Sequence, residues 1–195
     1  MKTPRIVEQV PLYDGWYRLH RLGIEMPDGA VAERHLLECR IAAAVLPYDP
    51  VRRVAMLVSQ PRAAVLASGE GPLLEAIAGN LDEMEPEECA RQEALEEAGL
   101  QLRGAIEPVA YIWPIPTVAT ERVHLYLTQY SAADRVSDGG GAEDEHEHVH
   151  PHEIGLDELR AMVLEGRLAD AKTLILAQAL LLARPDLWVP ATGEG

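Results

Sequence analysis

The sequence predicts an α+β protein, and three observations lead to this class. Two apolar runs, residues 40–48 and 53–62, flank a Tyr-Asp-Pro turn and have the pattern of a hairpin of buried strands. An acidic segment between Pro86 and Gly99 is framed as a helix, because proline suits a first helical position and glycine suits the residue after a helix end. Apolar residues at helical spacing over 174–183 predict a core-facing helix.

Residues 1–38 are expected to form an N-terminal portion with an antiparallel β-sheet, followed by a main domain over residues 39–195. Segments 16–24 and 33–39 have the composition of strands, and a Pro-Asp-Gly sequence at 27–29 predicts the turn between them. The sequence therefore predicts one small sheet followed by one larger domain.

Charge and composition exclude several classes of protein. The chain has 32 acidic against 17 basic residues and a net charge of −15, which argues against nucleic-acid binding, since that depends on Lys and Arg neutralising phosphates. There is no apolar run long enough for a bilayer and no signal-peptide core, so we expect a cytoplasmic protein that binds no membrane. Cys39 and Cys89 are expected to be small buried side chains without a disulfide.

Three glutamates of the predicted helix, Glu93, Glu96 and Glu97, lie on adjoining turns. Like charges three or four residues apart destabilise an isolated helix, so a cation between them would be stabilising. Mg²⁺ prefers oxygen ligands and is usually shared with substrate phosphates. An acidic helix face can also be simply solvated, and the carboxylates alone leave both interpretations open.

Residues 79–100 resemble the signature of the Nudix hydrolases, which runs glycine, five residues, Glu, a spacer, then Arg-Glu-apolar-any-Glu-Glu-any-Gly-apolar. The matching residues are Gly79, Glu85, Glu93, Ala94, Glu96, Glu97, Gly99 and Leu100. There are two departures: the spacer after Glu85 is one residue short, and Gln92 stands where the family has Arg. A short spacer containing Glu-Pro-Glu is similar to the GDP-mannose hydrolase branch of the family, close to the ADP-ribose pyrophosphatases.

Further segments resemble these branches in the same order along the chain. The residues that match are Gln60 and Arg62 at a strand end, Glu75 before the signature, Pro114, Thr120 and Glu121 in a loop, Glu145 and Glu147 after a glycine run, and Lys172-Thr173 in a motif that opens a terminal helix.

The resemblance implies a Nudix fold, an α/β/α sandwich around a mixed β-sheet. It implies a hydrolase of the pyrophosphate bond of a nucleoside diphosphate linked to a sugar, of the GDP-mannose or ADP-ribose type. It also implies Mg²⁺ or Mn²⁺ and a homodimer in which the N-terminal sheet packs across the two-fold axis.

The same resemblance assigns roles to individual residues. The metal ligands it implies are the Ala78 carbonyl, Glu93, Glu96 and Glu97. The catalytic residues it implies are Glu97 together with Glu145 or Glu147 as the base. The expected substrate-binding residues are Arg62, Glu75, Glu121 and Arg122. Arg62 and Arg122 are expected on phosphate oxygens or across the dimer interface, because Arg presents a planar fork suited to phosphate.

Two other interpretations remain open from the sequence. A degenerate Nudix domain that binds a nucleotide without hydrolysing it is favoured by Gln92 and opposed by the intact glutamates. A soft-metal tract is the other, because four histidines follow the glycine run at alternate positions: His146, His148, His150 and His152.

Overall fold

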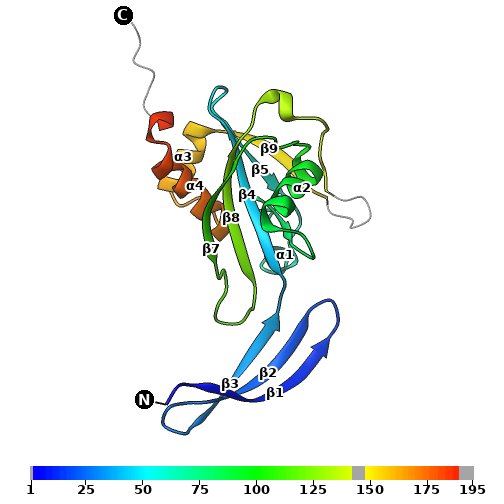
Figure 1. Ribbon diagram of the computed structural model, residues 1–195, viewed down its shortest axis with the longest axis vertical. Helices are drawn as coiled ribbons and strands as arrows, with labels where there is room; N and C mark the ends of the chain where they lie inside the picture. The colour runs from blue at the N-terminus through cyan, green and yellow to red at the C-terminus, as the bar shows by residue number, and fades with distance from the viewer. Residues whose placement is uncertain (1, 142–147, 189–195) are drawn as a thin grey trace, which may run out of the picture. The chain divides into compact units, whose positions relative to one another are not determined.

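The computed structural model describes residues 2–141 and 148–188 of the chain (Figure 1). The chain divides into two compact units: residues 1–41 with 112–123, and residues 42–111 with 124–195. None of the helices in the described ranges has the length and apolar run needed to span a bilayer.

The first unit contains a three-stranded antiparallel sheet in the order β1-β2-β3, formed by β1 (Arg5–Asp14), β2 (Arg18–Glu25) and β3 (Val31–Glu38). The predicted strands at 16–24 and 33–39 are confirmed as β2 and β3, with Gly29 at φ +89° in the turn between them. β1 was not predicted, because nine of its ten residues are exposed and they lack the alternation that identifies a strand.

The second unit contains a six-stranded sheet in the order β7-β8-β4-β5-β9, with β6 paired to β4. Its strands are β4 (Ile41–Asp49), β5 (Val54–Ser59), β6 (Ile77–Asn80), β7 (Ile106–Ile112), β8 (Arg122–Gln129) and β9 (His150–Gly155). Its helices are α1 (Ala63–Ala67), α2 (Pro86–Ala98), α3 (Leu156–Leu164) and α4 (Ala171–Ala183), with 3-10 turns at Ala132–Asp134 and Pro185–Trp188. The hairpin predicted at 40–62 is confirmed as β4 and β5.

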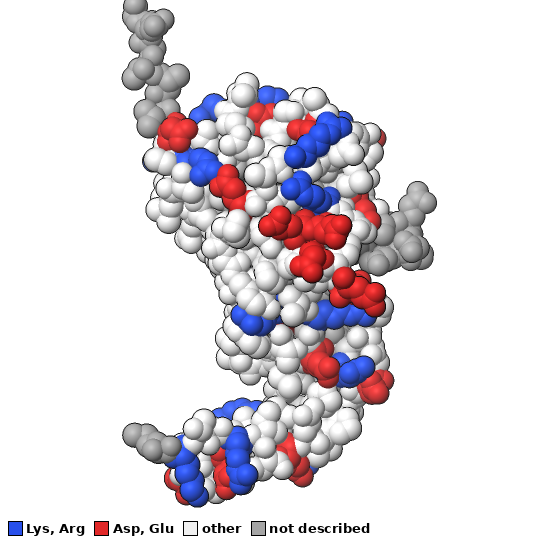
Figure 2. Space-filling model, in the orientation of Figure 1, with Lys and Arg blue, Asp and Glu red and all other residues white. Residues whose placement is uncertain are grey.

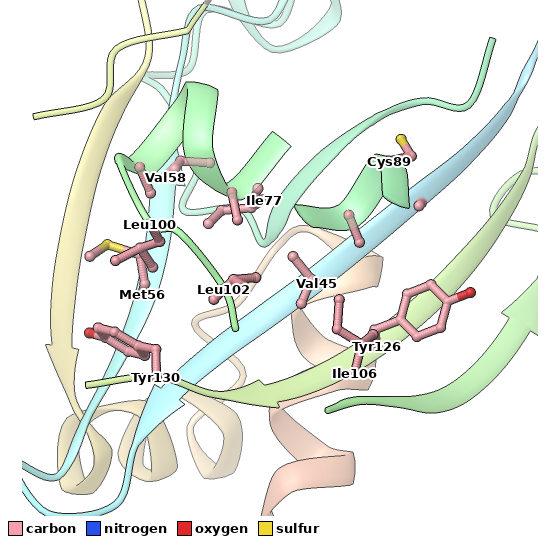
Figure 3. Close-up of a cluster of buried hydrophobic side chains, with 14 of the residues drawn as sticks. Val45, Met56, Val58, Ile77, Cys89, Leu100, Leu102, Ile106, Tyr126 and Tyr130 are labelled. Atoms are coloured by element: carbon pink, nitrogen blue, oxygen red, sulfur yellow. The ribbon is translucent and has the colours of Figure 1, made fainter. Parts of the chain in front are cut away.

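Alternate residues of the central strands face two different helical layers. Ala43 and Val45 of β4 and Met56 and Val58 of β5 belong to the buried cluster under α2 (Figure 3). Because strand side chains alternate, the intervening buried residues point to the opposite face, where α3 and α4 lie (Figure 1). The α/β/α sandwich implied by the resemblance is therefore confirmed.

Helix α2 begins and ends where its sequence predicts. Pro86 is its first residue, and Gly99 follows its last residue in the left-handed conformation at φ +66°. The Gly99 N–H donates to the Leu95 carbonyl at 3.0 Å, and Leu100 N–H donates to the Ala94 carbonyl at 2.9 Å. These bonds close the helix in the manner of a glycine C-cap.

An ion network fixes the turn between β4 and β5 to β9. Arg52 donates to the buried Asp49 at 2.6 Å and to both oxygens of Glu153 at 2.8 and 2.9 Å. Tyr130 donates to Glu153 at 2.9 Å. The hydrogen bonds from Arg52 lower the pKa of Glu153, and this effect outweighs the opposing effect of burial. Glu153 therefore stays ionised and stabilises the fold above its depressed pKa.

Replacing Arg52 with Met should lower the free energy of unfolding at about pH 7 by about 2 kcal/mol, because the buried Asp49 loses its charged partner. The difference from the wild type should shrink as the pH falls below 4.5, the ordinary pKa of a glutamate, and on through the lowered pKa of Glu153, because protonation of Glu153 removes the same interaction. Urea denaturation at about pH 7 and over this acidic range measures the difference. Arg167→Met, which removes exposed ion pairs to Glu158 and Glu165, is the control and should change little. A pH-independent loss for Arg52→Met would contradict the assignment.

Candidate active site

The end of β6 lies directly against Glu93 of α2. A Cβ atom built on Gly79 would overlap the Glu93 carboxylate, so any other residue at this position would require the Glu93 side chain to move. Ala78, the residue before it, pairs with Ala44 in the antiparallel ladder of β4 and β6. The glycine at this position therefore allows a carboxylate of α2 and the backbone of β6 to lie in close contact.

Glu97 is the most deeply buried carboxylate of α2, with 1% of its surface exposed. Gln60, just after β5, donates through its side-chain amide to one carboxylate oxygen at 3.2 Å. The Ala78 N–H donates to the other oxygen at 3.3 Å. Hydrogen bonds of this kind compensate for the cost of burying a polar group, so Glu97 joins α2, β5 and β6 at one point.

Gln92, at the position of the family Arg, donates to Glu96 four residues further along α2 at 2.8 Å. Arg91 points elsewhere: it donates to the carbonyls of Leu102 at 2.6 Å and Gly104 at 2.9 Å. Arg91 therefore holds the segment that follows α2 and does not replace the missing Arg. The half-buried Glu96 is therefore contacted by the neutral amide of Gln92, where the family pattern has a charged Arg.

Arg62 and Glu75 form a bidentate ion pair, with distances of 2.9 and 3.0 Å. Glu75 is buried, and Lys172 lies 3.7 Å from it and 2.7 Å from Asp170. Burial acts to raise the pKa of Asp170, but the charge of Lys172 and the hydrogen bonds from Lys172 and Thr173 outweigh it and lower the pKa overall. This chain of alternating charges joins the residues after β5 to the start of α4.

The remaining predicted site residues do not belong to the described part of the second unit. Glu121 and Arg122 belong to the first unit, where the Arg122 guanidinium lies 5.1 Å from the centre of the Trp113 ring. Glu145 and Glu147, the two candidates for the catalytic base, fall outside the described residues.

The donors around α2 suit a hard divalent cation. Glu93, Glu96, Glu97 and the Ala78 carbonyl present oxygen atoms, and acidic side chains gather over α2 and the loop before it (Figure 2). Gly79 provides the close approach that brings Glu93 to the strand. In the described ranges, no three His, Cys, Asp or Glu side chains are grouped so that they could hold a metal ion.

The Cys89 thiol of α2 lies beside the end of β6, 3.6 Å from the Gly79 carbonyl. Cys89 is buried, its thiol lies 3.4 Å from the Asn80 carbonyl, and burial raises its pKa to about 12, so the thiol is uncharged. Cys39 is only half-buried, which corrects the prediction that both cysteines are buried; both are free. In the tract proposed for a soft metal, His152 contacts the Ser59 hydroxyl at 2.8 Å, and His146 lies outside the described residues.

Two residues of the site were not assigned a role from the sequence. Gln60 was noted only as a match to the strand end, yet it donates to Glu97. Lys172 was noted only as part of a closing motif, yet it contacts Glu75, which precedes it by 97 residues. Neither contact follows from sequence spacing, because both depend on how the sheet and α4 are packed.

Comparisons with known proteins identify the family of the chain. The family model described as NUDIX domain matches residues 39–176. GDP-mannose pyrophosphatase of Cronobacter sakazakii is 39% identical over 159 residues, covering 80% of this chain and 82% of the relative. The protein of the same name from Pectobacterium atrosepticum is 35% identical over 183 residues, covering 91% of this chain and 93% of the relative.

A solved structure titled "Crystal structure of ADP compounds hydrolase" matches with a TM-score of 0.77 at 14% identity, covering 95% of this chain and 96% of that chain. This likeness concerns the fold. Because the family model matches more than half of the chain and the relatives align over most of their length, the chain belongs to the Nudix family.

Proposed function

We propose that the protein hydrolyses the pyrophosphate bond of GDP-mannose or a closely related nucleotide sugar, releasing a nucleoside monophosphate and a sugar phosphate. The observation that carries this proposal is the position of Glu97, buried and hydrogen-bonded between Gln60 and the Ala78 N–H, beside a glycine that admits Glu93. The names of the relatives support GDP-mannose over ADP-ribose as the substrate.

The residues proposed to hold Mg²⁺, or Mn²⁺, are Glu93, Glu96, Glu97 and the carbonyl of Ala78. When bound, the cation neutralises the pyrophosphate and stabilises charge that develops on the leaving phosphate. Mg²⁺ is usually held by one or two carboxylates together with substrate phosphates and water, which suits a donor set of this kind. An acidic protein can bind an anionic substrate in this way.

The chain's own residues would bind and activate the reactants. Glu145 or Glu147 would accept a proton from a water whose oxygen forms the new bond to phosphorus, while the anhydride P–O bond breaks and the leaving phosphate takes the electron pair. Arg62, oriented by Glu75, and Arg122 would supply positive charge to the phosphates. Glu121 and Glu75 complete the proposed substrate-binding set.

Incubation with Mg²⁺ and a panel of GDP-mannose, ADP-ribose, other sugar nucleotides and nucleoside triphosphates tests the reaction. We expect release of GMP and mannose 1-phosphate from GDP-mannose, and loss of activity when a chelator removes the metal. The absence of turnover with every compound, together with a ligand-induced rise in melting temperature, would instead favour the nucleotide-binding alternative. Gln92, a neutral residue in the Arg position, is the observation that favours that alternative.

Replacing Glu97 with Gln should reduce kcat by more than the roughly 10- to 100-fold that loss of an outer partner of a metal ligand costs. The shape of the side chain is kept, so the melting temperature should stay near the wild-type value. Glu88→Gln, which neutralises an exposed acid on the first turn of the same helix, is the matched control and should retain activity. Equal turnover by Glu97→Gln and Glu88→Gln would refute the role of Glu97.

The homodimer remains a proposal, supported by the surface of the first unit. Its sheet and the turn between β1 and β2 expose large apolar side chains: Ile6, Val7, Leu12, Tyr13, Trp16, Tyr17 and Val31. A three-stranded sheet needs a buried apolar face for stability, and exposed apolar patches mark interaction surfaces. A second copy of the chain, packed on one face of this sheet, would bury those of these residues that point to that face.

Replacing Trp16, which is 84% exposed, with Arg should shift the protein towards the monomer, because a charge would enter the proposed interface. Leu182→Arg is the matched control, since Leu182 is 83% exposed on α4. Light scattering coupled to size-exclusion chromatography measures both variants over a range of concentrations. A wild-type protein that is monomeric throughout would rule out the dimer.

A further inference from the structure

Three consecutive glycines, residues 139–141, run along the last turn of α2; we call them the glycine strap. The Gly140 N–H donates to the Glu97 carbonyl at 3.0 Å, and the Gly141 N–H donates to the Glu96 carbonyl at 3.0 Å. All three have positive φ angles, of 75°, 129° and 84°. The strap therefore bonds to the backbone of two of the proposed metal ligands.

These bonds satisfy carbonyls that the helix itself leaves unpaired. The last four carbonyls of an α-helix have no partner within it. In α2 the Leu95 carbonyl is taken by Gly99, and the next two, of Glu96 and Glu97, are taken by the strap. Carboxylates near a helix C-terminus are also opposed by the helix dipole, and α2 has no basic residue in its last turn. The strap brings two N–H groups to this negative end.

The close approach of the strap requires glycine at its first position. A Cβ atom on Gly139 would overlap the Glu97 carbonyl oxygen and would lie 2.8 Å from the Ala98 backbone. A Cβ atom on Gly140 would meet nothing within 4 Å. Gly139 is therefore the residue at which a single methyl group would push the strap away from α2.

The strap is anchored to the rest of the second unit on both sides. Before it, the Val136 N–H donates to the Gly99 carbonyl at 2.8 Å. After it, the N–H of Val149, a residue of the buried cluster under α2, donates to the Gly140 carbonyl at 3.3 Å. The strap is thus attached both to the core and to the helix end.

We propose that the glycine strap is a positioning element of the active site, which holds the last turn of α2 so that Glu96 and Glu97 meet the cation in a fixed orientation. The inference rests on the proposed function, because it concerns the residues assigned there to the metal. Helix ends fray, and ligands placed on a fraying turn would lose orientation and affinity. Backbone hydrogen bonds from outside the helix oppose this fraying.

Gly139→Ala tests the proposal in the full-length protein, with Mn²⁺ alone as the probe and binding followed by calorimetry. We expect Mn²⁺ affinity to fall by about 10- to 100-fold, as is typical when a partner of a metal ligand is disturbed. The matched control is Gly166→Ala, because Gly166 has φ +69° and open space around its Cβ position. The control carries a similar backbone strain but does not touch α2, so it should bind Mn²⁺ as the wild type does.

Gly140→Ala keeps the proposal testable if Gly139→Ala does not fold. Its methyl group meets open space, so it strains the strap without entering α2, and Mn²⁺ affinity should fall by about tenfold. Strap variants that bind Mn²⁺ as tightly as Gly166→Ala would overturn the proposal while leaving the proposed function in place. A wild-type protein that binds no Mn²⁺ would instead overturn the metal site, and with it this positioning role.

Discussion

The burial of one carboxylate, that of Glu97, is the constraint on which the site depends. A charged group with 1% of its surface exposed must have hydrogen-bond donors, and these come from Gln60 after β5 and from Ala78 in β6. Helix α2 is therefore fixed against two strands at the point where its acidic residues gather. Glu75, also buried, is compensated by Arg62 and Lys172. The buried carboxylates of Glu97 and Glu75, which cost free energy to remove from water, therefore lie where the proposed chemistry occurs.

Local signals in the sequence predicted the framework well. Pro86 and Gly99 marked the ends of α2, because one fixes the first helical turn and the other adopts a left-handed conformation at low cost. The apolar runs of β4 and β5 were long enough to be recognised. β1 was missed because its side chains face solvent on both sides, which leaves no period to detect.

Contacts between distant segments could not be predicted from local patterns. The pairing of Gln60 with Glu97 and of Lys172 with Glu75 depends on sheet order and helix packing, which spacing along the chain does not encode. The signature resemblance identified the glutamates, but it left Gln92 unexplained. In the structure the Gln92 side chain donates to Glu96. A neutral amide donor therefore stands where the family has the positively charged Arg, and it still contacts a glutamate of the signature.

The overlap that any side chain at Gly79 would create with Glu93 has an evolutionary consequence. Any amino-acid substitution of this glycine adds at least a methyl group, which here would displace the Glu93 carboxylate while every acidic residue stays in the sequence. A lineage could lose the site by this route and still carry an intact pattern of glutamates. In related sequences, the residue at this one small position is therefore as informative as the charges themselves about which descendants have kept the activity.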